Sequence, residues 1–110
     1  EYDCELIRQI PRIGATMKPY EDFDARWTIK NRSAYTWTIT SAKLSYANGT
    51  RMHKYDDSYP VKHSVRLGDE VDLVIDMLAP SEPGRYSTSW VLTNSTRTAC
   101  ILTTTIYVVK

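Results

Sequence analysis

Few side chains in this sequence have the type and spacing that chemistry requires, and the densest group lies in one polar stretch. His53, Asp56 and Asp57 fall within TRMHKYDDSY, residues 50–59. An imidazole beside carboxylates can bind a metal or act in acid/base catalysis. The stretch has no sustained hydrophobic periodicity, however. We therefore expect an exposed loop in which these side chains are solvated, in preference to a weak metal or acid/base site.

No second motif supports catalysis. The other histidine, His63, is on a separate predicted segment, and the GxSxG, HExxH and glycine-rich phosphate-binding patterns are absent. Cys4 and Cys100 lack the CxxC spacing of redox and zinc sites. The sequence therefore predicts a protein that is not an enzyme and that needs no metal or cofactor.

The composition excludes further partners. The net charge is +1 with acidic and basic residues interspersed, which leaves no basic stripe for nucleic acid. No apolar run approaches the roughly 20 residues of a membrane helix, so we expect no membrane insertion. The chain is rich in Tyr, Trp, Thr and Val along its whole length, as all-β proteins are. We expect one domain over residues 1–110, cut from a longer multidomain protein.

The stretch APSEPGRYSTSWVL, residues 79–92, predicts a tight corner followed by a strand. Tyr86 comes two residues after Gly84, which is the sequence form of the tyrosine corner in immunoglobulin-like sandwiches. Thr88 and Trp90 would share one face of the strand with Tyr86, because side chains alternate along a strand.

The remaining patterns predict about seven strands. Residues 23–31 and 70–77 alternate apolar and polar side chains, as half-buried strands do. The other expected strands cover residues 4–10, 36–40, 43–47, 61–65 and 99–109. Together they predict an antiparallel β-sandwich of the immunoglobulin-like, or fibronectin III-like, type.

The aromatic residues divide into two groups. Trp27, Trp37 and Trp90 fall at inward positions of predicted strands, so with Tyr86 we assign them to the structural core. Three tyrosines instead lie in or beside predicted loops: Tyr35, Tyr55 and Tyr59. Exposed rings can stack on sugars or anchor a protein interface, but Tyr is also common in edge strands. We keep these three as candidate ligand contacts.

Cys4 and Cys100 stand at the openings of the first and last predicted strands. In an immunoglobulin-like sandwich the first strand can run parallel beside the last, which would bring the two thiols together. A disulfide is the favoured interpretation and is typical of exported proteins. The alternative is a pair of buried free thiols in a cytosolic domain. Three Asn-x-Ser/Thr triplets also fall in predicted turns, at Asn31, Asn48 and Asn94, but such triplets arise often by chance and carry no weight for localisation.

The order of several segments resembles the four-tryptophan, or FW, domain. These segments are ARWTIKN, YTW, LSYANGTRM, VRLGDEVDLVIDMLAP and PGRYSTSWVL, and the resemblance covers about residues 23–109. FW domains are immunoglobulin-like modules of selective-autophagy cargo receptors and of bacterial extracellular proteins. Trp27, Trp37 and Trp90 match three signature tryptophans, whereas Thr103 lies near the position of the fourth.

The resemblance implies a binding role without catalysis. In the receptors the domain binds cargo or partner proteins, and the bacterial copies resemble accessory modules. Similar bacterial members often pair a first-strand cysteine with one just before the second signature tryptophan. That position here resembles Tyr35, so Cys100 would replace it as the partner of Cys4.

From this resemblance we expect an interaction or spacer module of an exported, bacterial surface protein. Its partner would be a protein or another component of the cell envelope, and its location extracellular or at the cell surface. One alternative is a carbohydrate-binding accessory module of a surface enzyme. The other is a cytoplasmic autophagy-receptor domain with reduced cysteines. The oligomeric state stays open.

Overall fold

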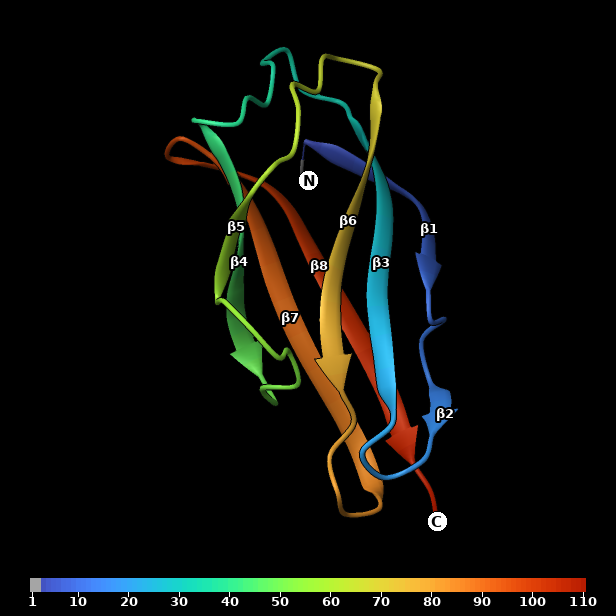
Figure 1. Ribbon diagram of the computed structural model, residues 1–110. Coiled ribbons are helices and arrows are strands. Elements are labelled where there is room, and N and C mark those ends of the chain that lie inside the picture. The colour runs from blue at the N-terminus through green and yellow to red at the C-terminus, as the bar shows by residue number, and fades with distance from the viewer. Residues whose placement is uncertain (1–2) are drawn as a thin grey trace.

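The computed structural model describes residues 3–110 as two packed β-sheets (Figure 1). One sheet has three strands in the order β1-β3-β6, and the other has five in the order β2-β8-β7-β4-β5. The strands are β1 (Cys4–Ile10), β2 (Ala15–Met17), β3 (Asp22–Asn31), β4 (Ala42–Gly49), β5 (Ser58–Pro60), β6 (Glu70–Leu78), β7 (Gly84–Asn94) and β8 (Arg97–Val108). The all-β immunoglobulin-like sandwich expected from the sequence is confirmed.

The alternation of side chains sets the register of the three-stranded sheet. β3 pairs antiparallel with β6 from Asp22 opposite Leu78 to Lys30 opposite Glu70. This register places Trp27 beside Leu73, so the apolar faces of the two strands coincide. A shift by one residue would turn every one of these side chains toward water.

The core lies between the two sheets. Trp27, Trp37 and Trp90 are fully buried there. Tyr86 is half-buried and packs against the core, and its hydroxyl donates a hydrogen bond of 2.7 Å to the Glu82 carbonyl. This bond is the tyrosine corner that ties the turn before β7 back onto its own backbone.

Two segments that we predicted as strands are not strands. Residues 36–40 and 61–65 meet each other in a single bridge between Trp37 and Val65, with backbone bonds of 2.9 and 2.8 Å. Ile39, predicted to face inward, is 56% exposed. The physical reason for the first error is a turn, since Thr38 and Ser41 bond through their side chains and end the extended backbone.

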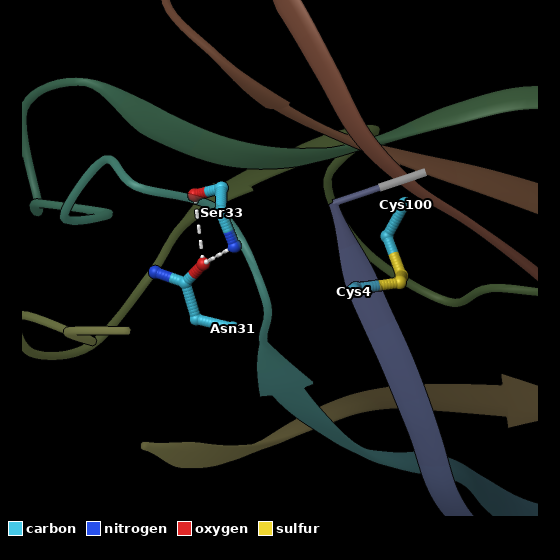
Figure 2. Close-up of a disulfide and its surroundings, with 4 residues drawn as sticks. All are labelled: Cys4, Asn31, Ser33 and Cys100. Carbon is cyan, nitrogen blue, oxygen red and sulfur yellow. Dashed lines mark hydrogen bonds between the residues drawn. A yellow bond between two sulfur atoms is a disulfide. The ribbon is translucent and has the colours of Figure 1, made fainter. Parts of the chain in front are cut away.

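The second error follows from the side chain of Asn31, which is fully buried (Figure 2). Its Nδ2 donates to the carbonyls of Tyr35 and Val65, at 2.9 and 2.8 Å. Its Oδ1 accepts bonds of 2.8 Å from both the backbone N–H and the hydroxyl of Ser33. Because Val65 is held at this end of the sandwich, the chain between β5 and β6 does not run beside β6 as a strand. The same bonds occupy the amide that a glycan would need.

The disulfide is confirmed, although the reason we gave for it is only partly right. Cys4 and Cys100 are bonded, with their Cα atoms 5.6 Å apart, and they join β1 of one sheet to β8 of the other (Figure 2). The strand that runs parallel beside β8 is β2, which places Ala15 opposite Ile106. β1 pairs with β3 instead, because the chain changes sheets after Ile10.

We predict that Asn31→Ala lowers the free energy of unfolding by about 2–3 kcal/mol, because the Ser33 N–H and two carbonyls lose their buried partner. Urea unfolding of the 110-residue chain measures this. Asn48→Ala is the matched control, since Asn48 is exposed, and it should change the value by less than about 0.5 kcal/mol. Equal losses in both variants would show that Asn31 does not organise this end of the sandwich.

Candidate functional site

The structure corrects our expectation for His53. We predicted a solvated loop residue, but the His53 side chain has no exposed surface. Its ring centroid lies 4.7 Å from that of Trp90, edge to face, and 4.8 Å from that of Tyr46. The backbone at His53 also forms a bridge with Met77 of β6. The ring is buried because it covers Trp90, a contact between distant residues that local polarity does not reveal.

Asp57 and Asp56, the two carboxylates predicted beside His53, differ in their contacts. Nε2 of His53 lies 2.5 Å from Oδ1 of Asp57, and Arg51 bonds to the same carboxylate. These hydrogen bonds, first from His53 and then from Arg51, hold the pKa of Asp57 below its usual range. The Asp56 side chain is exposed, and the backbone N–H of Asp56 donates a bond of 3.0 Å to the Tyr59 hydroxyl.

The hydrogen bond between His53 and Asp57 joins two residues of the segment between β4 and β5. The Nδ1 atom of His53 is buried without a partner among the described residues. Within residues 3–110 no Ser, Thr or Cys side chain bonds to the ring, so the pair has no adjacent nucleophile. The described part of the chain also has no group of three or more His, Cys, Asp or Glu placed to hold a metal ion.

The three candidate tyrosines have different environments. Tyr35 is 57% exposed, and its ring lies 5.4 Å from the guanidinium carbon of Arg97. Tyr55 is 60% exposed. Tyr59 is half-buried, with its ring centroid 6.4 Å from that of Trp90.

These tyrosines do not form one platform. Tyr35 lies beside Asn31, at the last residue of β3. Tyr55 follows Lys54, which pairs with Asp22 at the first residue of β3. A strand of this length spans about 30 Å, so Tyr35 and Tyr55 lie near opposite ends of the sandwich.

The clearest accessible feature is the outer edge of β6. At one end of this strand, the Leu78 N–H donates to the Met52 carbonyl at 2.8 Å, and the Asp76 carbonyl accepts from the Lys54 N–H at 3.0 Å. Backbone groups alternate in direction along an antiparallel strand. The backbone N–H and C=O groups of the even-numbered residues of β6 therefore point away from β3.

Beyond that short contact the edge is open. Asp72 and Val74 direct their N–H and C=O groups outward, and no backbone bond to these groups comes from residues 3–110. Figure 1 shows β6 at the border of its sheet, with β3 on one side only. The predicted strand over residues 61–65 would have been the natural neighbour for this edge, but it is not a strand.

An apolar hollow of about 250 Å³ adjoins the open edge, between β6 and the β4-β5 pair. Its apolar lining consists of Leu44, Tyr59, Pro60, Leu73, Val74 and Ile75. A second hollow of about 580 Å³ lies on the other side of the edge, where Arg8, Arg26 and Lys62 contribute to its wall. The free N–H and C=O groups of Asp72 and Val74 thus lie between an apolar hollow and a polar one.

The outward side chains of β6 include three carboxylates, at Glu70, Asp72 and Asp76, and two of these interact with charged residues of β3. Asp72 accepts bonds from Thr28 at 2.5 Å and Arg26 at 3.1 Å, and these bonds hold its pKa below the usual range. Asp24 of β3 shares a hydrogen bond with Asp76, its neighbour in the register, and this contact raises the pKa of Asp24. The third carboxylate, Glu70, is exposed.

These opposite shifts give a pH prediction. Folding favours the protonated form of Asp24, so the unsubstituted protein loses stability as the pH rises through the folded pKa of this group. Asp24→Asn should therefore raise the melting temperature at pH 7, with the difference closing below about pH 3. Asp72 contributes stability above its unfolded pKa that is lost as the pH falls, so Asp72→Asn should lower the melting temperature at pH 7. Shifts of the same sign in the two variants would contradict this assignment.

Comparisons with known proteins agree with the fold. Protein JOKA2 from Solanum tuberosum is 25% identical over 99 residues, which cover 84% of this chain and 11% of that protein. The chain thus corresponds to a small part of this relative. WR4, a C. elegans MSP family member of solved structure, matches with a TM-score of 0.54 and 9% identity, over 99% of this chain and 100% of that chain. This second likeness is one of fold alone.

The family is established by a match over most of the chain. A family model described as the Ig-like domain from next to BRCA1 gene matches residues 12–108. The matched region begins after β1 and extends to the last residue of β8. The chain therefore belongs to the family of the Ig-like domain from next to BRCA1 gene.

Proposed function

We propose that this chain is a non-catalytic protein-interaction module of an exported protein. The observation that carries the proposal is the open edge of β6 beside the apolar hollow. Unpaired strand edges bind other chains readily, and apolar hollows with a few polar groups are typical of binding sites. A protein segment can use both features at once, because it brings backbone groups as well as side chains.

The disulfide supports the exported location. Disulfides persist in oxidising compartments and are rare in the cytosol. The bond between Cys4 and Cys100 closes almost the whole chain, with a sequence separation of 96, and such a large loop stabilises the fold in the chain-entropy model. Among residues 3–110 no helix is long and apolar enough to cross a bilayer. A bacterial surface protein, as implied by the FW resemblance, is the source that we propose.

The short match to JOKA2 supports a module within a longer protein, since only 11% of that relative is covered. We accordingly propose that the domain works beside others and presents its sheet edge and loops to a partner in the cell envelope. The burial of His53 and its bond to Asp57 support a structural role for this pair of residues.

The test is binding to intact cells of the source organism. We expect fluorescently labelled chain, with its disulfide formed, to bind saturably and to lose this binding after the cells are treated with protease. Periodate oxidation of the surface sugars should leave binding intact. The matched control is the same chain reduced and alkylated at both cysteines, which should bind more weakly because its sheets are no longer cross-linked.

Two results would contradict the proposal. Binding that survives protease but disappears after periodate would identify a carbohydrate module. Absence of saturable binding would remove the cell-surface partner altogether.

A further inference from the structure

We infer that the polar hollow beside the open edge of β6 receives an acidic segment of the partner protein, whose side-chain carboxylates pair with basic residues of the wall. This inference deepens the proposed function and rests on it. It gives the partner a chemical character and names the side chains that recognise it.

The wall of this hollow comes from separate parts of the chain. β1 contributes Arg8, β3 contributes Arg26, and the segment between β5 and β6 contributes Lys62 and His63. The hollow has a volume of about 580 Å³, which leaves room for side chains of a peptide. Basic residues that are distant in the sequence thus meet at one place on the surface.

A bulge in β1 turns Arg8 toward the hollow. In the register with β3, Leu6 stands opposite Ile29. Arg8 stands opposite Thr28, so one residue of β1 between these pairs is extra. Without the extra residue Arg8 would stand opposite Trp27, whose side chain lies in the core. Bulges re-aim side chains in this way and are frequent beside functional sites.

Lys62 and His63 are held in place on the other side of the hollow. They lie between Val61 and Val65, which are both buried in the core. Backbone bonds fix both ends, because the Val61 N–H donates to the Ala42 carbonyl at 3.1 Å and a bridge holds Val65. The segment that does not form a strand therefore presents its basic side chains at a fixed position beside β6. Such prior ordering favours binding, since less conformational entropy is lost when the ligand arrives.

The carboxylates in the wall already have partners. Glu70 and Asp72 both line the hollow. Asp72 accepts hydrogen bonds from Arg26 and Thr28. Glu70 stands opposite Lys30 in the register of β3 and β6, and opposite charges across neighbouring strands attract each other.

Arg8, Lys62 and His63, in contrast, form no salt bridge with any residue between 3 and 110. An incoming carboxylate can supply the counter-charge. The guanidinium of Arg8 suits this role, because its planar fork binds a carboxylate through two parallel hydrogen bonds. The unpaired charges of the wall therefore favour an acidic ligand.

Two features favour a protein segment over a polymer of phosphates. The free backbone groups of Asp72 and Val74, which also line the hollow, offer hydrogen bonds that a peptide backbone can meet. The carboxylates of Glu70 and Asp72 repel a ligand that carries a negative charge on every unit, whereas a peptide can space its charges to avoid them.

The experiment uses the 110-residue chain with its disulfide intact and a synthetic probe, the capped peptide ETETETE. Amide NMR should show saturable shifts at Arg8, Arg26, Lys62 and His63. Added sodium chloride should weaken the binding, because salt screens exposed charges. The control peptide QTQTQTQ has the same length without the charges, and it should not saturate over the same concentrations.

Single substitutions separate recognition from folding. Arg8→Gln should weaken ETETETE binding about threefold, because it removes one exposed charge pair. The matched control is Arg85→Gln, which makes the same change at an exposed residue of β7 and should leave binding unchanged. Glu70→Gln should strengthen binding by a similar factor, since it removes a negative charge from the wall. A loss of folded structure cannot produce this gain.

A double variant relates the hollow to the partner on cells. The chain with Arg8→Gln and Lys62→Gln should show weaker protease-sensitive binding to cells than the chain with Arg85→Gln. If the double variant binds as well as the unsubstituted chain, the partner uses another surface and the inference is wrong, while the interaction role stands. Loss of protease-sensitive binding by the unsubstituted chain would instead contradict the proposed function.

Other results would also overturn the inference. They are no saturation with ETETETE at millimolar concentration, equal binding of ETETETE and QTQTQTQ, equal losses in Arg8→Gln and Arg85→Gln, or weaker binding after Glu70→Gln. Saturable binding of poly(glycerol phosphate) at concentrations at which ETETETE does not bind would identify a phosphate polymer as the ligand of this hollow.

Discussion

The side chain of Asn31 is the interaction on which the rest of this structure depends. It satisfies all of its hydrogen-bonding groups in the interior and holds two segments to the end of β3, the nearby turn at Tyr35 and the distant segment at Val65. A buried amide is stable only when it is bonded in this way, so the position of both segments is fixed together. The consequence lies elsewhere in the fold. The segment that follows β5 does not pair with β6 as a strand, although its Lys62 and His63 line a hollow beside β6.

A second constraint limits the length of the open edge. His53 packs on Trp90 and bonds to Asp57. With His53 in this position, Met52 and Lys54 form backbone hydrogen bonds with the last residues of β6. The edge is therefore closed at one end by this loop, and it is open only near Asp72 and Val74. The disulfide joins β1 to β8, and Cys4 stands opposite Asn31 in the β1-β3 register, so the cross-link lies at the same end of the sandwich as the Asn31 side chain (Figure 2).

The sequence could predict whatever depends on neighbours along a strand. The alternation in β3 and β6 and the corner at Tyr86 are local patterns, and the structure agrees with them. Contacts between residues far apart in the sequence could not be predicted in this way. Asn31 and Val65 are 34 residues apart, and the Asn-x-Ser triplet that begins at Asn31 carries no weight in the sequence analysis, although the same spacing also forms a side-chain turn.

The candidate site was missed for the same reason. The sequence does not predict that His53 is buried, because most residues of 50–59 are polar and the ring that it covers, Trp90, is far away in the sequence. The open edge of β6 is even less visible, since it results from a strand that does not form. The alternation of residues 70–77 predicts the strand itself but not whether both of its sides are paired.

The most direct test of the account is residue-resolved amide hydrogen exchange in the free chain. If the edge of β6 is open, Asp72 and Val74 should exchange quickly while Leu73 and Ile75, which bond to β3, exchange slowly. Equal, strong protection of both sets would mean that the chain itself covers this edge, and it would contradict the central claim that a partner can bind there.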